Sequence, residues 1–386
     1  MHWKLAAAAA AVALGLAACR DATTPTEQSQ QAAQAVSGQY IVVFRDAVVD
    51  PPGLARQLVQ LHGGSLQFTY TSAIKGFAAR LPAAAVRALE LDPNVAYIEP
   101  DQPFHADVTQ SMDANGDPWG LDRIDQSALP LSRTYSYAST GAGVHAYIID
   151  TGIWTLHSDF GGRANNVYDA FGATGEDCHG HGTHVAGTTG GATYGVAKGV
   201  SLHGVRVLSC AGIGLTSQII AGIDWVRSNH IKPAVANMSL GGGLSTALNT
   251  ATTNLWNAGV FVAVAAGNDD VDACTASPAS ASGAFTAAAS TKTDAKASFS
   301  NWGTCVEGYA PGSAIVSDFL AGTTVSLSGT SMASPHVAGV GALYKATFGD
   351  APSATVSNWI IGNSTTGVIT GNPGGTPNRL LNKQTL

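Results

Sequence analysis

Ser331 lies in the motif Gly-Thr-Ser-Met-Ala at residues 329–333, where a run of small and apolar residues begins. The glycine permits a sharp turn, and the run that follows predicts a helix buried on all sides. The first backbone N–H groups of a helix have no partners within it, so they can face a group beside Ser331. Ser331 is therefore a candidate nucleophile, although Gly-x-Ser at a helix start is also typical of an ordinary capped helix.

A serine hydroxyl is a weak nucleophile near neutral pH, so it needs a nearby base. Three histidines lie among glycines in residues 177–187: His179, His181 and His184. We expect His181 to be the base, because glycines on both sides let it stand clear of the backbone. His181 could instead be an ordinary helix-start residue, and His184 a buried structural histidine. A metal site is disfavoured, because His-x-His-x-x-His lacks the helical pair and partner acid of zinc proteases.

Two polar residues follow strand-like apolar runs. Asp150 comes directly after residues 144–149, and Asn268 follows residues 262–267. Sites in parallel sheets form at the carboxyl ends of strands, where Asp150 could orient an imidazole and the Asn268 amide could donate to an oxyanion. Each could instead be a turn-forming residue.

The elements that must position these side chains alternate along the chain. Near-continuous apolar strands separated by helices predict an α/β fold, a doubly wound, mostly parallel sheet with helices on both faces. The expected strands are 144–149, 202–208, 234–240 and 260–266, and the expected helices are 217–229 and 246–258. We expect this large domain to span residues 118–386.

Residues 38–105 predict a separate, smaller α+β unit. Its order is βαββαβ, which fits a ferredoxin-like fold. The strand-like runs are 40–44, 66–70, 74–81 and 95–99, with helical runs at 54–61 and 86–89. Residues 106–117 are polar and read as an exposed connector, with a cut expected between about His105 and Ala114.

The N-terminus has the layout of an export signal at residues 1–18, with Lys4 before an apolar run. That run is too short for a stable transmembrane helix. Leu-Ala-Ala-Cys at residues 16–19 resembles a bacterial lipobox, which makes Cys19 a lipidation candidate, with ordinary cleavage after Ala18 as the alternative. Residues 19–37 read as a flexible linker. We expect an exported protein, extracellular or associated with the cell envelope.

Composition limits the partners and the redox state. Charged residues are 12% of the 386 residues and the net charge is -7, so no basic surface for nucleic acid is expected. Beyond Cys19 the chain holds four cysteines, an even number that predicts disulfides in an exported protein. Sequence alone permits three pairings, and zinc is disfavoured because no Cys-x-x-Cys pair occurs. The four are Cys178, Cys210, Cys274 and Cys305.

Taken together, Asp150, His181, Asn268 and Ser331 stand in the order and motif context of the subtilisin-like serine proteases, which this chain resembles. The shared motifs are Ile-Asp-Thr-Gly at 149–152, His-Gly-Thr-His at 181–184, Ala-Gly-Asn at 266–268 and Gly-Thr-Ser-Met-Ala at 329–333. Within the family, Trp-Gly-Leu-Asp-Arg-Ile-Asp at 119–125 and Ser-Leu-Gly-Gly-Gly at 239–243 resemble the proteinase K and aqualysin branch. Residues 38–105 resemble that branch's inhibitory propeptide.

The resemblance implies a self-processing zymogen of a broad-specificity endopeptidase. Ser331 would attack the peptide carbonyl, His181 would take its proton, Asp150 would orient the imidazole, and Asn268 with the Ser331 N–H would bind the oxyanion. The residues expected at the substrate are Gly212, Ile213, Gly214, Ser239, Leu240 and Gly241 beside the peptide, and Ala265, Ala266 and Gly267 in the pocket. Because the pocket walls lack bulk, we expect cleavage after aromatic and aliphatic residues.

The resemblance also implies structural calcium and a disulfide pairing. Asp122, Asp125 and Gln126 match one Ca²⁺ site, but Ser132 and Thr134 stand where further ligands are expected, and Glu307 replaces an aspartate of another site. The implied disulfides join Cys178 with Cys210 and Cys274 with Cys305. The implied partners are protein and peptide substrates and the chain's own propeptide, and we expect a monomer. A lipid anchor before processing follows only from the lipobox-like sequence at Cys19, with ordinary cleavage after Ala18 as the alternative.

Three other functions would leave different signatures. A peptide-binding relative without activity is disfavoured because every catalytic position is intact. An esterase of the α/β-hydrolase kind is disfavoured because the chain lacks Gly-x-Ser-x-Gly and its candidate triad has another order. A purely structural envelope lipoprotein would not react with a fluorophosphonate probe.

Overall fold

The structure is a computed structural model that describes residues 36–105, 109–110 and 118–386. The expected signal at residues 1–18, Cys19, nearly all of the linker at 19–37 and most of the connector at 106–117 lie outside the described residues. Within the described part of the chain, no helix has both the length and the hydropathy needed to cross a membrane.

A nine-stranded sheet forms the centre of the large domain, in the order β19-β20-β16-β15-β13-β11-β7-β9-β8. Every neighbouring pair is parallel except β19 and β20 at one edge, which confirms the expected doubly wound sheet. The strands are β7 (His145–Asp150), β8 (Ala164–Asp169), β9 (Ser201–Arg206), β11 (Ala234–Met238), β13 (Phe261–Ala265), β15 (Phe285–Ser290), β16 (Gly308–Pro311), β19 (Thr365–Thr366) and β20 (Arg379–Leu380).

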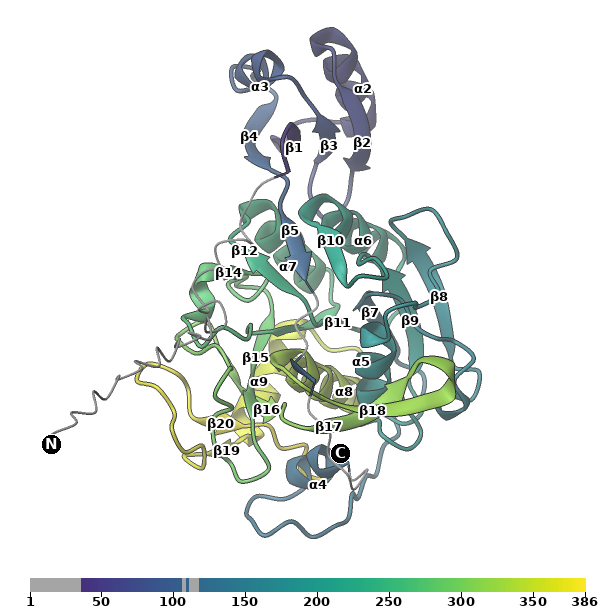
Figure 1. Cartoon of the computed structure of the whole chain (residues 1–386), viewed down its shortest axis with the longest axis vertical. Coiled ribbons are helices and arrows are strands. Elements are labelled where there is room, and N and C mark those ends of the chain that lie inside the picture. Colours follow the sequence, from purple (N-terminus) through teal and green to yellow (C-terminus); the bar gives the residue numbers. More distant parts are fainter. Residues whose placement is uncertain (1–35, 106–108, 111–117) are drawn as a thin grey trace, which may run out of the picture.

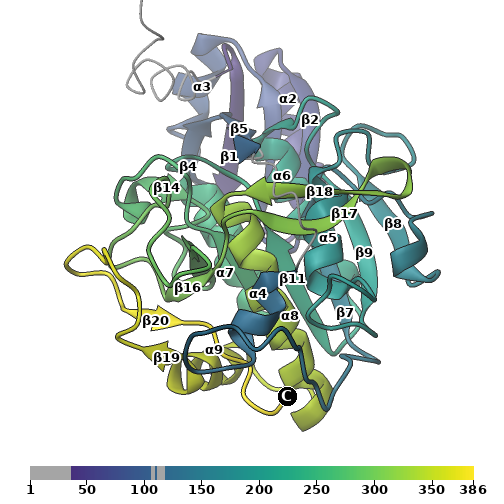
Figure 2. The same cartoon turned by 60° about the horizontal axis from the view of Figure 1, so that its bottom comes forward.

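Helices cover both faces of this sheet (Figures 1 and 2). Successive side chains of a strand point to opposite faces, so Ala146 and Ile148 of β7 join one core while Tyr147 and Ile149 join the other. The first core includes side chains of α5 (His181–Gly190), α8 (Thr330–Phe348) and α9 (Ser353–Asn363). The second includes those of α6 (Thr216–Asn229) and α7 (Thr246–Asn257).

Shorter elements complete the large domain. The helical ones are α4 (Trp119–Ile124) and the 3-10 turns η1 (Ser158–Phe160), η2 (Ala273–Thr275) and η3 (Leu320–Gly322). A hairpin of β17 (Ile315–Phe319) and β18 (Thr323–Ser328) leads directly into α8. The short strands β10 (Ile213–Leu215), β12 (Gly241–Gly243) and β14 (Ala276–Ser277) lie outside the central sheet.

The small unit forms a four-stranded antiparallel sheet in the order β2-β3-β1-β4, the ferredoxin-like arrangement that the sequence predicts. Its elements are β1 (Gln39–Phe44), α2 (Pro51–His62), β2 (Ser65–Tyr70), β3 (Gly76–Arg80), α3 (Ala83–Leu89) and β4 (Val95–Pro100). One face of this sheet packs on the unit's own two helices. The other face contributes Ile41, Val43, Tyr70 and Ala78 to the same apolar core as the side chains of α6 and α7. Figure 1 shows the unit above these two helices.

The segment that leaves the small unit lies on the large domain as two short strands. β5 (Pro103–His105) pairs antiparallel with β10 on one side and with β12 on the other. β6 (Thr109–Gln110) pairs antiparallel with β18, the strand that precedes α8. In Figure 1, β5 lies between β10 and β12.

Candidate active site

Asp150 and His181 are brought together by the end of β7 and the start of α5. The Nδ1 atom of His181 lies 2.8 Å from Oδ1 of Asp150, and both side chains are fully buried. The backbone N–H of Thr151 donates to the same carboxylate oxygen at 2.7 Å. Gly180 precedes the helix with φ of 100°, a left-handed conformation that glycine adopts without strain. The carboxylate therefore holds the imidazole by its Nδ1 side.

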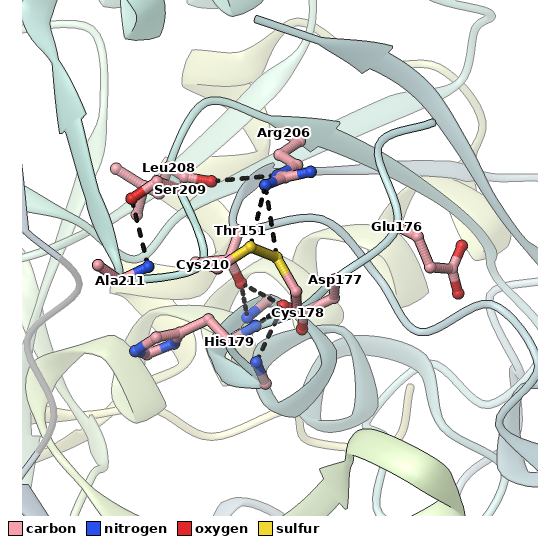
Figure 3. The surroundings of a disulfide bond; sticks show 12 residues. Thr151, Glu176, Asp177, Cys178, His179, Arg206, Leu208, Ser209, Cys210 and Ala211 are labelled. Atoms are coloured by element: carbon pink, nitrogen blue, oxygen red, sulfur yellow. Dashed lines mark hydrogen bonds between the residues drawn. A yellow bond between two sulfur atoms is a disulfide. The ribbon is translucent and has the colours of Figure 1, made fainter. Parts of the chain in front are cut away.

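Asp177 connects the two elements that carry this pair. Its carboxylate accepts hydrogen bonds from the backbone N–H groups of His179, Gly180 and Thr183, each at 2.9 Å. The hydroxyl of Thr151, next to Asp150, also donates to Asp177 at 2.9 Å. Figure 3 shows Asp177 beside Thr151 and His179. Sequence reasoning missed Asp177, although an acid just before a helix start is a known capping signal.

His184 has a structural environment rather than a catalytic one. Its Nε2 donates to the backbone oxygens of Ile315, at 3.0 Å, and Val325, at 3.2 Å. Complete burial lowers the pKa of His184 to about 3, so the ring stays neutral. Among the described residues, no group of three or more His, Cys, Asp or Glu side chains is arranged to hold a metal ion.

Ser331 lies in the first turn of α8, which packs beside α5 (Figures 1 and 2). Its hydroxyl donates to the backbone oxygen of Ser239 at 3.2 Å. α8 is buried from Thr330 to Lys345, as expected from its small and apolar residues. The helix start thus places the serine on the same side of the sheet as the α5 terminus that carries His181.

Asn268 follows β13 and is oriented by the residue before Ser331. Its Oδ1 accepts hydrogen bonds from the backbone N–H of Thr330 at 2.8 Å and from the Thr330 hydroxyl at 2.9 Å. The backbone N–H of Gly267 donates to the same hydroxyl at 3.0 Å. Because these contacts fix the carbonyl end of the amide, they also fix the direction of its NH₂ group.

The residues expected beside a substrate fall into two groups. β10 and β12 carry the edge residues and flank β5, with Gly214 opposite Phe104 and Gly241 opposite His105. Ser239 and Leu240 are buried between β11 and β12, Ile213 begins β10, and Gly212 directly precedes it. Of the expected pocket residues, Ala265 ends β13, and Ala266 and Gly267 follow it directly before Asn268.

Both disulfides form with the pairing that the resemblance implied. Cys178 and Cys210 have Cα atoms 5.0 Å apart, and Cys274 and Cys305 have Cα atoms 5.3 Å apart. The first bridge ties the segment before α5 to the loop after β9 (Figure 3). The guanidinium of Arg206 lies 3.4 Å and 3.5 Å from its two sulfur atoms.

The residues expected at calcium lie together at the end of α4. Asp122 accepts hydrogen bonds from the N–H groups of Ser132 and Arg133, and Asp125 accepts one from Ser136. Gln126 Oε1 accepts from the same Ser132 N–H at 2.9 Å. Burial raises the pKa of Asp125, and the Ser136 N–H and the Lys383 charge partly oppose this rise. This oxygen-rich donor set suits calcium in its chemistry.

Glu307 is half-buried beside β15. The backbone N–H of Thr286 donates to its carboxylate at 2.6 Å. Burial raises the pKa of Glu307 to about 7, a shift that this hydrogen bond and Arg379 partly oppose.

Comparisons with known proteins match both parts of the chain. A family model described as "Subtilase family" matches residues 141–382, and one described as "Peptidase inhibitor I9" matches residues 39–107. The "Extracellular serine proteinase" of Thermus sp. (strain Rt41A) is 48% identical over 375 residues, which cover 91% of this chain and 90% of that protein. The "Cuticle-degrading protease" of Metarhizium anisopliae is 42% identical, with 91% and 90% covered.

A solved structure supports the same likeness. The crystal structure of a cold adapted subtilisin-like serine proteinase is 48% identical, with a TM-score of 0.68. The match covers 69% of this chain and 98% of that chain. It therefore extends over nearly all of that enzyme.

Proposed function

This chain belongs to the subtilase family of serine proteases and carries an I9 inhibitor propeptide, and from this premise we propose that Asp150, His181 and Ser331 are its catalytic triad. It is a secreted serine protease. The observation that carries the assignment is the 2.8 Å contact between His181 Nδ1 and Asp150 Oδ1, made at a helix start that packs beside the helix of Ser331.

The proposed reaction begins when His181 Nε2 takes the proton of the Ser331 hydroxyl while Oγ attacks the peptide carbonyl carbon. Asp150 holds Nδ1 protonated and stabilises the imidazolium that forms. The Asn268 NH₂ group and the Ser331 backbone N–H donate to the oxyanion. His181 then gives its proton to the leaving amine, and water releases the acyl group by the same steps in reverse.

The test is Ser331→Ala in the full chain. We expect nearly complete loss of turnover of a chromogenic peptide, with an unchanged circular dichroism spectrum. Combining it with His181→Ala should add little, because a triad acts as a unit. Near-native turnover by Ser331→Ala would reject the assignment.

We propose that the chain cuts itself between His105 and Thr109, within the window that the sequence predicted. β5 lies between β10 and β12 like a bound peptide. β6 pairs with β18, and Thr109 of β6 is opposite Ser328, which precedes Ser331 by three residues. The proposed cut therefore lies between these two strands. Cleavage between them would leave β5 bound as a product strand that inhibits the enzyme.

Expression of Ser331→Ala in a host lacking other proteases tests self-processing. We expect this variant to remain full length apart from signal removal, whereas the unmodified chain gives a mature fragment that starts between residues 106 and 109. A mature fragment from the inactive variant would show that another protease makes the cut.

We propose a preference for aromatic and aliphatic residues before the cut. Support comes from the small side chains Ala265 and Ala266 and from Gly267, which offer neither bulk nor charge. Affinity should then follow the apolar area that the substrate buries. Cleavage of a peptide library measures this, and a profile dominated by arginine or lysine would reject it.

We also propose that the exported chain is anchored by lipid at Cys19 until processing releases a monomer. The support is the lipobox-like sequence upstream of the proposed cut. Intact mass of the membrane-bound precursor should exceed the signal-cleaved mass by the lipid. A precursor without added mass would favour ordinary cleavage after Ala18.

Calcium binding at Asp122, Asp125 and Gln126 is a further proposal. It rests on the two neighbouring carboxylates and on their oxygen-rich surroundings. Bound calcium would screen these charges and stabilise the loop that follows α4. We expect a chelator to lower the thermal midpoint of the unmodified protein. The same chelator should leave the thermal midpoint of Asp122→Asn unchanged.

A further inference from the structure

Helix α8 contains a proline four residues after the proposed nucleophile. Pro335 has no backbone N–H, so the carbonyl of Ser331 lacks its normal helical partner. The proline ring also crowds this carbonyl and tilts it away from the helix axis. Because Ser331 is fully buried, water cannot replace the missing donor, and another protein group must do so.

Ser239 supplies that donor from outside the helix. Its hydroxyl donates to the Ser331 carbonyl oxygen at 2.7 Å. The backbone oxygen of the same Ser239 accepts from the Ser331 hydroxyl at 3.2 Å. Ser331 is thus held at its backbone and at its side chain by a single residue that directly follows β11.

A directional chain of hydrogen bonds supports the Ser239 hydroxyl. Ser334 Oγ donates to Asn237 Oδ1 at 2.7 Å, and Asn237 Nδ2 donates to Ser239 Oγ at 2.8 Å. Because the Ser239 proton is committed to Ser331, its oxygen must accept, which fixes the Asn237 amide orientation. All four side chains are completely buried. This series of hydrogen bonds therefore begins at Ser334 of α8, passes through Asn237 of β11 and Ser239, and ends at Ser331 of α8.

We propose that Ser239 Oγ is a positioning group that replaces the helical hydrogen bond removed by Pro335 and so holds the Ser331 backbone in register with the sheet. The inference rests on the proposed function. The proline releases the carbonyl from its own helix, and the serine attaches it to β11 instead. The direction of the Ser331 N–H, proposed as an oxyanion donor, is then set by the central sheet. Strand β13 of the same sheet leads to Asn268, the other proposed donor.

A double-mutant cycle of Ser239→Ala and Pro335→Ala tests this role, with kcat and KM measured separately. Ser239→Ala should lower kcat roughly 10- to 100-fold, the scale of a small displacement at a reacting group. KM should change less than kcat. Pro335→Ala restores an N–H that can reach the Ser331 carbonyl, so the double variant should recover most of the lost kcat.

Matched controls separate positioning from general damage. Ser290→Ala removes another fully buried hydroxyl, one that has no hydrogen-bond partner among the described residues, and should leave kcat unchanged. If Ser239→Ala fails to mature, the rate of self-processing of the full chain provides the same cycle. A double variant no more active than Ser239→Ala, or native kcat in Ser239→Ala, would overturn the inference. Failure of the proposed function itself would appear separately, as activity in Ser331→Ala.

Discussion

His181 and His184 lie three residues apart on α5, yet their surroundings give them different properties. His181 contacts the Asp150 carboxylate, whereas His184 meets two backbone carbonyls and has a pKa of about 3. The glycines around His181 indicated which ring stands clear of the backbone. Asn237 and Ser239 were not assigned their hydrogen-bonding roles, because a buried contact between distant segments leaves no spacing pattern in the sequence. Asp177 did have a signal, its place just before a helix start.

Replacement of Asp177 by asparagine should destabilise the protein and slow catalysis. The Asp177 carboxylate accepts hydrogen bonds with both oxygens, whereas asparagine replaces one oxygen with an NH₂ group that cannot accept. Each buried N–H donor left unpaired costs about 1–3 kcal/mol. The Asp150 turn and the α5 start would then lose their common partner. We expect a lower thermal midpoint and a lower kcat, with a shifted acid limb of the pH–rate profile.

Glu176→Gln is the matched control for Asp177→Asn. Glu176 accepts hydrogen bonds from Thr155 and Asn166 instead, and Figure 3 shows it apart from the Asp177 cluster. We expect this variant to lose stability while its acid limb stays in place. Equal changes in the acid limb of both variants would argue against a specific role for Asp177.

Replacement of Asp318 by asparagine should stabilise the protein in alkaline solution. Burial, with a contribution from Asp159, raises the pKa of Asp318 to about 8, and the Nδ1 atom of His157 lies 3.6 Å from its Oδ1. A raised folded-state pKa favours folding below the unfolded value, about 3.9, and that stability is lost as pH rises through about 8. Asparagine carries no charge to bury, so the loss should diminish.

Thermal midpoints of the Asp318→Asn enzyme, measured from about pH 5 to about pH 9, check the prediction. This interval covers most of the range between the unfolded and folded pKa values. The control is Asp270→Asn, because the side chain of Asp270 is 58% exposed. An unchanged slope of midpoint against pH in Asp318→Asn would contradict the assigned cause.

At the scale of elements, the long strands and helices followed from the apolar pattern, because a doubly wound sheet buries both strand faces. The two strands that cross the candidate active site did not. β5 and β6 have three and two residues, too few for a period, and their hydrogen bonds come from β10, β12 and β18. The sequence indicated only an exposed connector with a cleavage site after the small unit.

The two disulfides should contribute similarly to stability but differently to activity. They close loops with sequence separations of 32 and 31, which the chain-entropy model values at about 3 to 4 kcal/mol each. Only Cys178 adjoins Asp177, which fixes the α5 start. We therefore expect Cys178→Ser with Cys210→Ser to lower both the unfolding free energy and kcat.

Cys274→Ser with Cys305→Ser provides the comparison of matched loop length. This pair should lower the unfolding free energy by a similar amount and change kcat less. Denaturant unfolding and peptide turnover measure the two effects. A larger kcat loss in the second pair would contradict the link between the first disulfide and His181.

At the scale of the whole molecule, the small unit and the large domain share one apolar core and a set of buried or half-buried carboxylates. Asp224 of α6 accepts from Ser72 and Ala73 of the small unit at 2.7 Å and 2.6 Å. In the opposite direction, Asp101 accepts from the Ser217 N–H, and Glu99 accepts from Ala247. The existence of two units was predictable from the break in pattern, but these contacts between them were not.

Inhibition by the separated propeptide should weaken as pH rises. Burial raises the pKa of Glu99, Asp101 and Asp224 in the joined state. Separation returns these carboxyls to water, so binding takes up protons. The joined state is therefore favoured below the raised pKa values and loses affinity as pH rises through them.

The prediction is checked by adding residues 36–105 to the mature enzyme and measuring the inhibition constant as pH rises through the raised pKa values of these carboxyls. Glu99→Gln removes one proton-binding group and should flatten the dependence. An inhibition constant that falls with rising pH would reverse the sign and reject the explanation.

The placement of β5 between β10 and β12 has a consequence for the time course of activation. Under the proposed self-processing, β5 occupies the substrate-binding strands of each newly made molecule, so the first cut would yield an inactive one-to-one complex of enzyme and propeptide. The first few molecules to lose their propeptide can digest those of their neighbours. Activity in a population should therefore show a lag followed by acceleration, and a trace of mature enzyme added as seed should shorten the lag.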